Sequence, residues 1–184
     1  TVTINGAGAT NVTGTYPNFT INSPVPTDAQ TLSLAGNTLS ISNGNSVSLP
    51  QAINFGAIAT NGSTVNSSSS LPVPFTLSYN NGGGTYAGGI YTAPVPGIYH
   101  IDASVMWSSS LLGTNELSIC IDGVPVRKKT IAITGLGTLT ESFGFSADIN
   151  VNTGQQISIT YSFGGSSVSV TDNVSWWFNG HLIK

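Results

Sequence analysis

Residues 90–107 read IYTAPVPGIYHIDASVMW, and this stretch decides the fold. Prolines and a glycine mark a turn, and from residue 98 onward the side chains alternate in character. Successive side chains of a strand point to opposite faces, so one face receives Tyr99, Ile101, Ala103, Val105 and Trp107. The opposite face receives His100, Asp102, Ser104 and Met106. A period of two over this length predicts a long strand with one face in the core.

The end of the chain, WWFNGHLI at residues 176–183, shows the same period. One face receives Trp176, Phe178, Gly180 and Leu182. The adjacent Trp177 therefore falls on the opposite face. A glycine among large apolar residues marks the close approach of a bulky side chain or of another chain. We expect this last strand to be a packing element, with Gly180 leaving room beside its neighbours.

Alternation of this kind continues through most of the chain, and glycine interrupts every candidate helix. The pattern predicts strands near 52–59, 73–79, 85–92, 97–108, 115–122, 124–134, 138–148, 155–163, 167–172 and 174–183. The polar stretch 61–70 is predicted to be a loop. Two sheets of four or five strands make a β-sandwich, so the predicted fold class is all-β.

Residues 1–50 form a separate compositional unit, with Pro50 as its boundary. Within residues 32–49 we expect three short strands joined by turns at 35–37 and 43–45, and residues 13–21 read as a further strand behind a turn. Each strand offers only one or two inward residues, too few to offset the entropy of ordering the chain. This β-rich unit must therefore lie on another domain or intertwine with copies of itself; the alternative is a flexible leader.

Composition limits the classes of function. Only 6% of the 184 residues are charged, four of them basic, and the net charge is −3, which argues against a nucleic-acid partner. No segment approaches the roughly 20 apolar residues that span a membrane, so we expect no membrane insertion. No signal peptide opens the chain, so we expect Thr1 to begin a mature or trimmed chain. Low charge with abundant Ser, Thr, Asn and Gly is common in exported fibres, which predicts an extracellular, cell-surface or virion location.

Residues 51–184 resemble a C1q-like domain, with the matching motifs in the family's order. The matching segments are Ala52-Ile53-Asn54-Phe55, Pro74-Phe75, the hairpin at 80–86, Ile90 to Tyr99, Leu117 to Gly123, Gly154-Gln155-Gln156-Ile157 and Phe178-Asn179-Gly180-His181-Leu182. The run from Ile90 to Tyr99 and the closing strand are specific when taken together. Gln155 departs from the family, which usually has Asp at that turn, and this weakens any transfer of an acidic function.

This resemblance implies a ten-stranded jelly roll related to tumour necrosis factor (TNF), assembled as a homotrimer at the tip of a stalk. No collagen repeat precedes residue 51; residues 13–19 and 39–49 are instead similar to β-rich segments of bacterial surface proteins and phage tail fibres. In such a trimer we expect Trp176 in the core or at the threefold interface. Trp177 is a candidate platform for a sugar ring, or packs against the neck or a neighbouring subunit.

Catalysis is not predicted, and we assign no catalytic residue. The seven acids are scattered without a local signature for a glycosidase pair. His100 and Asp102 lie two residues apart on one strand face, but no nucleophile elbow accompanies them. We interpret this pair as a polar contact at a sheet surface or between subunits. Cys120, the single cysteine, reads as a small buried side chain.

Two sets of residues are candidates for ligand binding. Arg127, Lys128 and Lys129 follow a turn, and a trimer would present them three times to anionic glycans or phosphates; the alternative is a solvated patch. No cofactor is expected, although Asp122, Asp148 and Asp172 are weak candidates for calcium ligands.

Three functions stay open from the sequence. The first is a non-enzymatic homotrimeric head of an extracellular or virion fibre that binds a cell-surface glycan or protein receptor. The second is a purely structural cap or trimerisation domain of such a fibre. The third is a secreted enzyme or its carbohydrate-binding accessory module.

Overall fold

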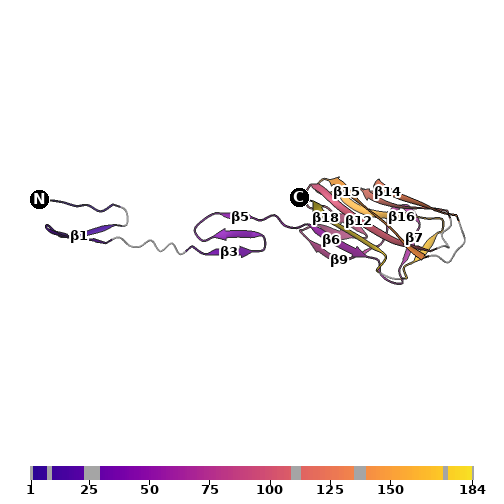
Figure 1. Ribbon diagram of the computed structural model, residues 1–184, viewed down its shortest axis with the longest axis horizontal. Helices are drawn as coiled ribbons and strands as arrows, with labels where there is room; N and C mark the ends of the chain where they lie inside the picture. Colours follow the sequence, from indigo (N-terminus) through magenta and orange to yellow (C-terminus); the bar gives the residue numbers. More distant parts are fainter. Residues whose placement is uncertain are drawn as a thin grey trace. The chain divides into compact units, whose positions relative to one another are not determined.

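A computed structural model describes residues 2–7, 10–22, 30–108, 113–134, 140–171 and 174–183, with the side chains of residues 107, 108, 140 and 141 left undescribed. The described residues form strands and turns without a helix (Figure 1), and so contain no helix that could cross a membrane. The chain divides into two compact units, Thr1–Pro50 and Gln51–Lys184. We call them the N-terminal unit and the C-terminal unit.

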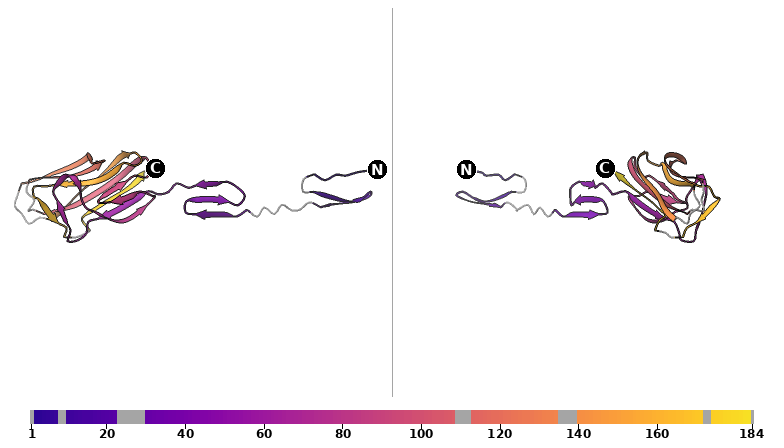
Figure 2. Two further views of the ribbon diagram at one scale, coloured as in Figure 1. Left: turned by 180° about the vertical axis from the view of Figure 1, so that it is seen from behind. Right: turned by 45° about the vertical axis from the view of Figure 1, so that its right-hand side comes forward.

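Two antiparallel sheets form the C-terminal unit, as Figures 1 and 2 show. The first, the β12 sheet, runs β15 (Thr140–Val151), β12 (Gly97–Ser108), β18 (Trp177–Ile183), β6 (Asn54–Ile58) and β9 (Thr76–Asn81). The second, the β13 sheet, runs β10 (Thr85–Ala87), β11 (Ile90–Thr92), β16 (Gln156–Ser162), β13 (Gly113–Ile121) and β14 (Val124–Ile133), and β8 (Ser68–Pro72) also pairs with β16. A separate pair joins β7 (Thr64–Asn66) to β17 (Ser167–Ser169).

The core lies between the two sheets and follows the predicted alternation. From β12, the side chains of Tyr99, Ile101, Ala103 and Val105 are fully buried. From β18 and β6, Phe178 and Phe55 meet edge to face, with ring centroids 4.9 Å apart. Alternation along β12 therefore identified the buried face correctly at these four residues.

The polar stretch 61–70, predicted as a loop, instead contains β7 and most of β8. Val65 opposes Val168 in register and is buried. The Ser67 hydroxyl donates to the carbonyl of Phe163 at 2.9 Å and accepts from its backbone N–H at 2.8 Å. The prediction was wrong because hydroxyl side chains can supply the hydrogen bonds that a short edge strand needs. The residues that pair with this stretch lie about a hundred positions further along the sequence, so no local pattern indicated them.

Several predicted strand bounds also differ from the structure by up to three residues, as at β9, β15, β17 and β18. The strand expected over 85–92 is a hairpin, because Gly88 and Gly89 both take positive φ, 58° and 80°, and turn the chain. The final strand begins at Trp177 rather than at residue 174, although Trp176 still points into the core.

The N-terminal unit contains two small sheets. Residues 13–21, predicted as one strand, belong to a hairpin of β1 (Asn11–Thr15) and β2 (Asn18–Asn22). The three strands and two turns predicted over 32–49 are confirmed as β3 (Leu32–Ala35), β4 (Thr38–Ile41) and β5 (Ser46–Ser48). Figure 2 shows these three strands as neighbours in one sheet.

Candidate functional site

Ionisable side chains gather on the outer face of the β12 sheet, around His100. The strand register sets His100 opposite Asp148 of β15 and opposite His181 of β18. His100 Nδ1 lies 2.6 Å from Asp148 Oδ1, and its Nε2 lies 3.3 Å from Asp102 Oδ1. The His100 and His181 rings have centroids 5.2 Å apart. We call these four residues the His100 cluster.

Hydrogen bonding to Asp148 raises the pKa of His100, and the charge of Asp102 adds to this effect. Partial desolvation lowers the pKa, by less than the hydrogen bond to Asp148 raises it. The five strands of this sheet contain no lysine or arginine. Protonation of His100 therefore places a positive charge between the two neighbouring carboxylates on this face.

The predicted pairing of His100 with Asp102 is confirmed, but it is the longer of two contacts. Asp148 and His181 were not predicted from the sequence as partners of His100. Asp148 lies 48 positions away from His100, and only the register of β12 against β15 brings the two together. No local motif could have indicated this, because the register depends on the whole sheet.

Asp122 has a structural role at the turn between β13 and β14. Its Oδ1 accepts the backbone N–H of Gln156 at 2.9 Å, and its Oδ2 accepts the side-chain amide of Gln155 at 2.8 Å. A glutamine at position 155 thus has a physical reason here. An amide at this position donates to Asp122, whereas an aspartate would place a second negative charge beside it.

Two of the three calcium candidates, Asp122 and Asp148, lie within the described residues. Within the described residues, no three His, Cys, Asp or Glu side chains form a group suited to a metal ion. Asp122 and Asp148 each bind nitrogen groups of the protein, and Asp172 lies outside the described residues. Calcium binding stays a prediction.

The three basic residues of β14 do not all lie on one face of the strand. Because side chains alternate along a strand, Lys128 points to one side and Arg127 and Lys129 to the other. Lys128 Nζ lies 3.2 Å from Glu116 Oε2, whereas Arg127 donates to the carbonyl of its neighbour Val126 at 2.8 Å. The period of two along β14 was available in the sequence and would have predicted this division.

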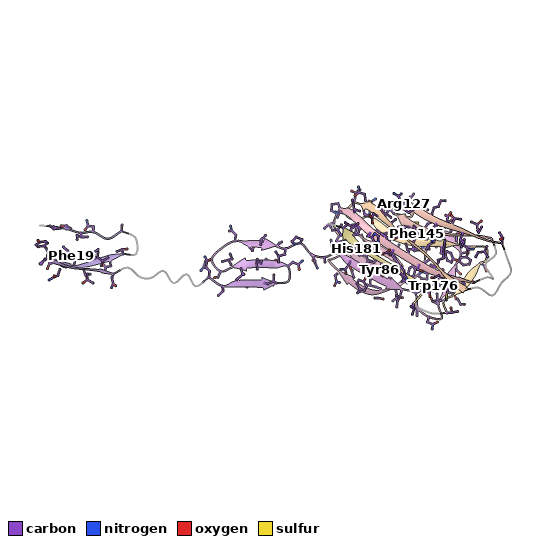
Figure 3. The ribbon with its side chains drawn as sticks, in the orientation of Figure 1. Phe19, Tyr86, Arg127, Phe145, Trp176 and His181 are labelled. Atoms are coloured by element: carbon purple, nitrogen blue, oxygen red, sulfur yellow. The ribbon has the colours of Figure 1, made fainter. Side chains whose placement is uncertain are left out.

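Lys129 braces the two sheets at one side of the sandwich. Its ammonium group donates to the carbonyl of Gly144 in β15 at 2.8 Å and lies 5.4 Å from the centroid of the Phe143 ring. Arg127, which Figure 3 labels, sits on β14 at the edge of the β13 sheet. Charged side chains on an edge strand also discourage pairing with other chains, so a protective role is an alternative to ligand binding.

Apolar side chains are exposed on the same outer face as the His100 cluster. Ile98 and Ile183 oppose each other in register and are 50% and 40% exposed. Tyr79 of β9 is 48% exposed and covers Gly56, where an added Cβ would lie only 2.2 Å from its ring. Trp177 is half-buried on this face, while Trp176 is fully buried in the core, as the alternation predicted.

Two surface hollows lie elsewhere, and neither contains a charged residue. One, of about 590 Å³, is lined mainly by residues of β1, β2 and the segment before them, including Val12 and Phe19. The other, of about 300 Å³, lies beside Leu71 and Pro72.

The sequence matches no protein-family model and no curated protein. Among solved structures, a crystal structure of murine APRIL at pH 8.5 is similar to this chain, with a TM-score of 0.56 and 12% sequence identity. The similarity covers 72% of this chain and 99% of that chain. At this identity it shows the fold alone, and it confirms the TNF-like jelly roll predicted from the sequence.

Proposed function

We propose that this chain forms a non-enzymatic, C1q-like homotrimeric head on an extracellular or virion fibre, where it recognises a cell-surface glycan or protein receptor. In this proposal residues 51–184 are the head and residues 1–50 are the neck. The observation that carries the proposal is the outer face of the β12 sheet. Ile98, Ile183, Tyr79 and Trp177 share that face with the His100 cluster, in which one imidazole contacts two carboxylates.

Such a face is suited to contact with copies of itself. Aromatic and aliphatic groups with few unpaired charges characterise the centre of protein interfaces. Homo-oligomers use closed symmetry, and three copies around an axis would cover the exposed isoleucines without leaving one face open. Trp177 then packs against a neighbouring subunit. Its half-buried position favours this role over stacking against a sugar ring.

Recognition in this account uses the surfaces that remain outside the trimer. Arg127 is the strongest candidate for an anionic ligand, because its only described side-chain bond is to a neighbouring carbonyl. Lys128 shares its charge with Glu116, and Lys129 holds the sheets together. A trimer repeats each weak site three times, which raises the overall affinity through avidity.

A glycan array and a cell-binding assay with the full chain test recognition. Arg127→Ser and Lys128→Ser are compared with Val124→Ser, a substitution on the same strand at an exposed uncharged position. We expect the basic substitutions to weaken binding at least about tenfold and Val124→Ser to leave it unchanged. Lys129→Ser is kept separate because it also removes the contact between sheets. Equal binding by all variants would reject the basic site.

A purely structural fibre cap is the second candidate, and the low charge of the whole chain favours it over an enzyme. A protein that assembles as a trimer but binds nothing in either assay supports the cap and rejects the receptor-binding head. A secreted carbohydrate-binding accessory module predicts instead a monomer that binds polysaccharide.

A further inference from the structure

The three-stranded sheet of β3, β4 and β5 has two chemically different faces. Leu32 opposes Ile41, Leu34 opposes Leu39, and Leu39 opposes Val47. Residues opposite each other in a sheet point to the same side. One face, which we call the aliphatic face, therefore consists of Leu32, Leu34, Leu39, Ile41 and Val47. The other, the hydroxyl face, consists of Ser33, Ala35, Thr38, Ser40, Ser46 and Ser48.

The aliphatic face has no cover within the described chain. Leu32 is 68% exposed, Leu34 63%, Val47 56% and Ile41 41%. A sheet this small without a second layer is marginal in water. Burial of apolar surface is the main favourable contribution to folding, and the five aliphatic side chains of this sheet all lie on the aliphatic face.

The charge of the segment indicates what covers this face. Residues 30–50 contain no Asp, Glu, Lys or Arg, so copies of this sheet meet without electrostatic repulsion. For the same reason the sheet offers no charge by which a different protein would be selected. The aliphatic face is self-complementary in its chemistry, which suits contact with the same face of another copy.

The hairpin of β1 and β2 repeats the same design independently. Val12 opposes Ile21 and Gly14 opposes Phe19, so these residues share one face. The opposite face carries Asn11, Thr13, Thr15, Asn18, Thr20 and Asn22. Both sheets of the N-terminal unit therefore have one apolar face and one uncharged polar face, and Asp28 is the single charged residue of this unit. This indicates that the apolar faces of both sheets are buried in the same way.

We propose that three copies of the chain bring their β3–β5 sheets together as a three-sided prism. The aliphatic faces point to a shared threefold axis and the hydroxyl faces to solvent. The proposal rests on the homotrimeric head of the preceding section, because residue 50 leads directly into the head and a trimer there raises the local concentration of the three sheets. In the prism each sheet keeps its own hydrogen bonds. The neck is therefore not a flexible leader, and the chains do not exchange strands.

The prism is organised in layers along its axis. Leu34, Leu39 and Val47 lie in one row across all three strands, and Leu32 and Ile41 form the next row. The rows are two residues apart, or about 7 Å along the strands. Leu39 lies in the central strand, so its side chain is placed at the middle of the shared core.

Hydrogen exchange of the full chain tests the prism, with mass measured in parallel. Leu39→Asn places an amide at the proposed core, while Ser40→Asn places the same amide on the hydroxyl face one residue away. We expect the backbone amides of residues 38–41 to be protected in the wild type and in Ser40→Asn. In Leu39→Asn we expect at least about tenfold faster exchange, because a buried amide without partners is costly. Exchange in residues 97–108 is expected to be unchanged in all three proteins.

A distance measurement tests which molecule covers the aliphatic face. Nitroxide labels at Ser40→Cys, in a Cys120→Ala background, lie outside the prism at three equivalent positions. The prism predicts one narrow distribution of distances between labels. Three results in a protein that is still a trimer would overturn the prism and leave the trimeric head standing. They are rapid exchange at residues 38–41 in the wild type, equal effects of the two Asn variants on exchange, and a broad distribution of distances between labels. A monomer would overturn the trimeric head, and with it the prism.

Discussion

Gly180 of β18 lies against the ring of Phe55 in β6, its partner in the strand register, so closely that a Cβ atom on residue 180 would lie 2.5 Å from Phe55 Cε1. The same atom would lie 2.7 Å from Ile101 Cδ1. The core here holds stacked aromatic rings, with the Phe55 and Tyr91 centroids 3.9 Å apart. Glycine at this position is therefore required by packing, as the sequence pattern indicated.

Gly180→Ala is expected to lower the free energy of unfolding by about 1–3 kcal/mol, the range for overpacking a well-filled core. Urea unfolding at a fixed protein concentration measures the change. Phe55→Leu in the same chain removes the ring that the new methyl group meets. We expect the double variant to lose less than the sum of the two single losses, and strict additivity would show that Phe55 is not the obstacle.

His100 is expected to titrate above the usual value of about 6.5. Since its folded pKa is raised, the stability contributed by protonated His100 is fully present below about pH 6.5. This stability is lost as the pH rises through the folded pKa. NMR titration of the imidazole measures the pKa directly. Asp148→Asn is expected to lower it because the main hydrogen-bond acceptor changes, and an unchanged pKa in that variant would contradict the assigned cause.

Cys120 is expected to be unreactive in the folded protein. The side chain is fully buried, burial raises the pKa of its thiol, and Sγ lies 3.7 Å from Thr160 Oγ1. A thiol-reactive probe should label less than about a tenth of the chains in native buffer and all of them in denaturant. Rapid labelling of the native protein would show that this part of the β13 sheet opens. Cys120→Ala, which removes only sulfur, serves as the unlabelled control.

Gln155→Asp is expected to destabilise the fold by about 1 kcal/mol, because it removes an amide donor and sets a carboxylate against Asp122. Asp122→Asn relieves the repulsion, so the same substitution should cost less in that background. Thermal unfolding of the four proteins checks the coupling. Equal effects of Gln155→Asp in both backgrounds would mean that the Gln155–Asp122 bond does not stabilise the turn.

The sequence predicted features that depend on local alternation and failed where distant strands decide. Tyr99 and Ile101 were placed in the core correctly, because a period of two needs no knowledge of the partner strand. Ser67 could not be placed in the same way, since its bonds to Phe163 depend on the packing of segments 96 residues apart. The His100–Asp148 contact was missed for the same reason. The placement of Lys128 and Arg127 on opposite faces of β14 is a different case. A strand over 124–134 was predicted, and its alternation would have separated the two side chains.

The mass of the full chain in solution tests the account most directly. Analytical ultracentrifugation across a range of concentrations, at pH 7, is expected to give a single species of about 57 kDa, three times the 18.9 kDa of one chain. Ile98→Asp with Ile183→Asp should shift this species towards smaller masses, because both side chains lie on the face assigned to the trimer. A wild-type protein that remains at 18.9 kDa at every concentration would contradict the trimeric head.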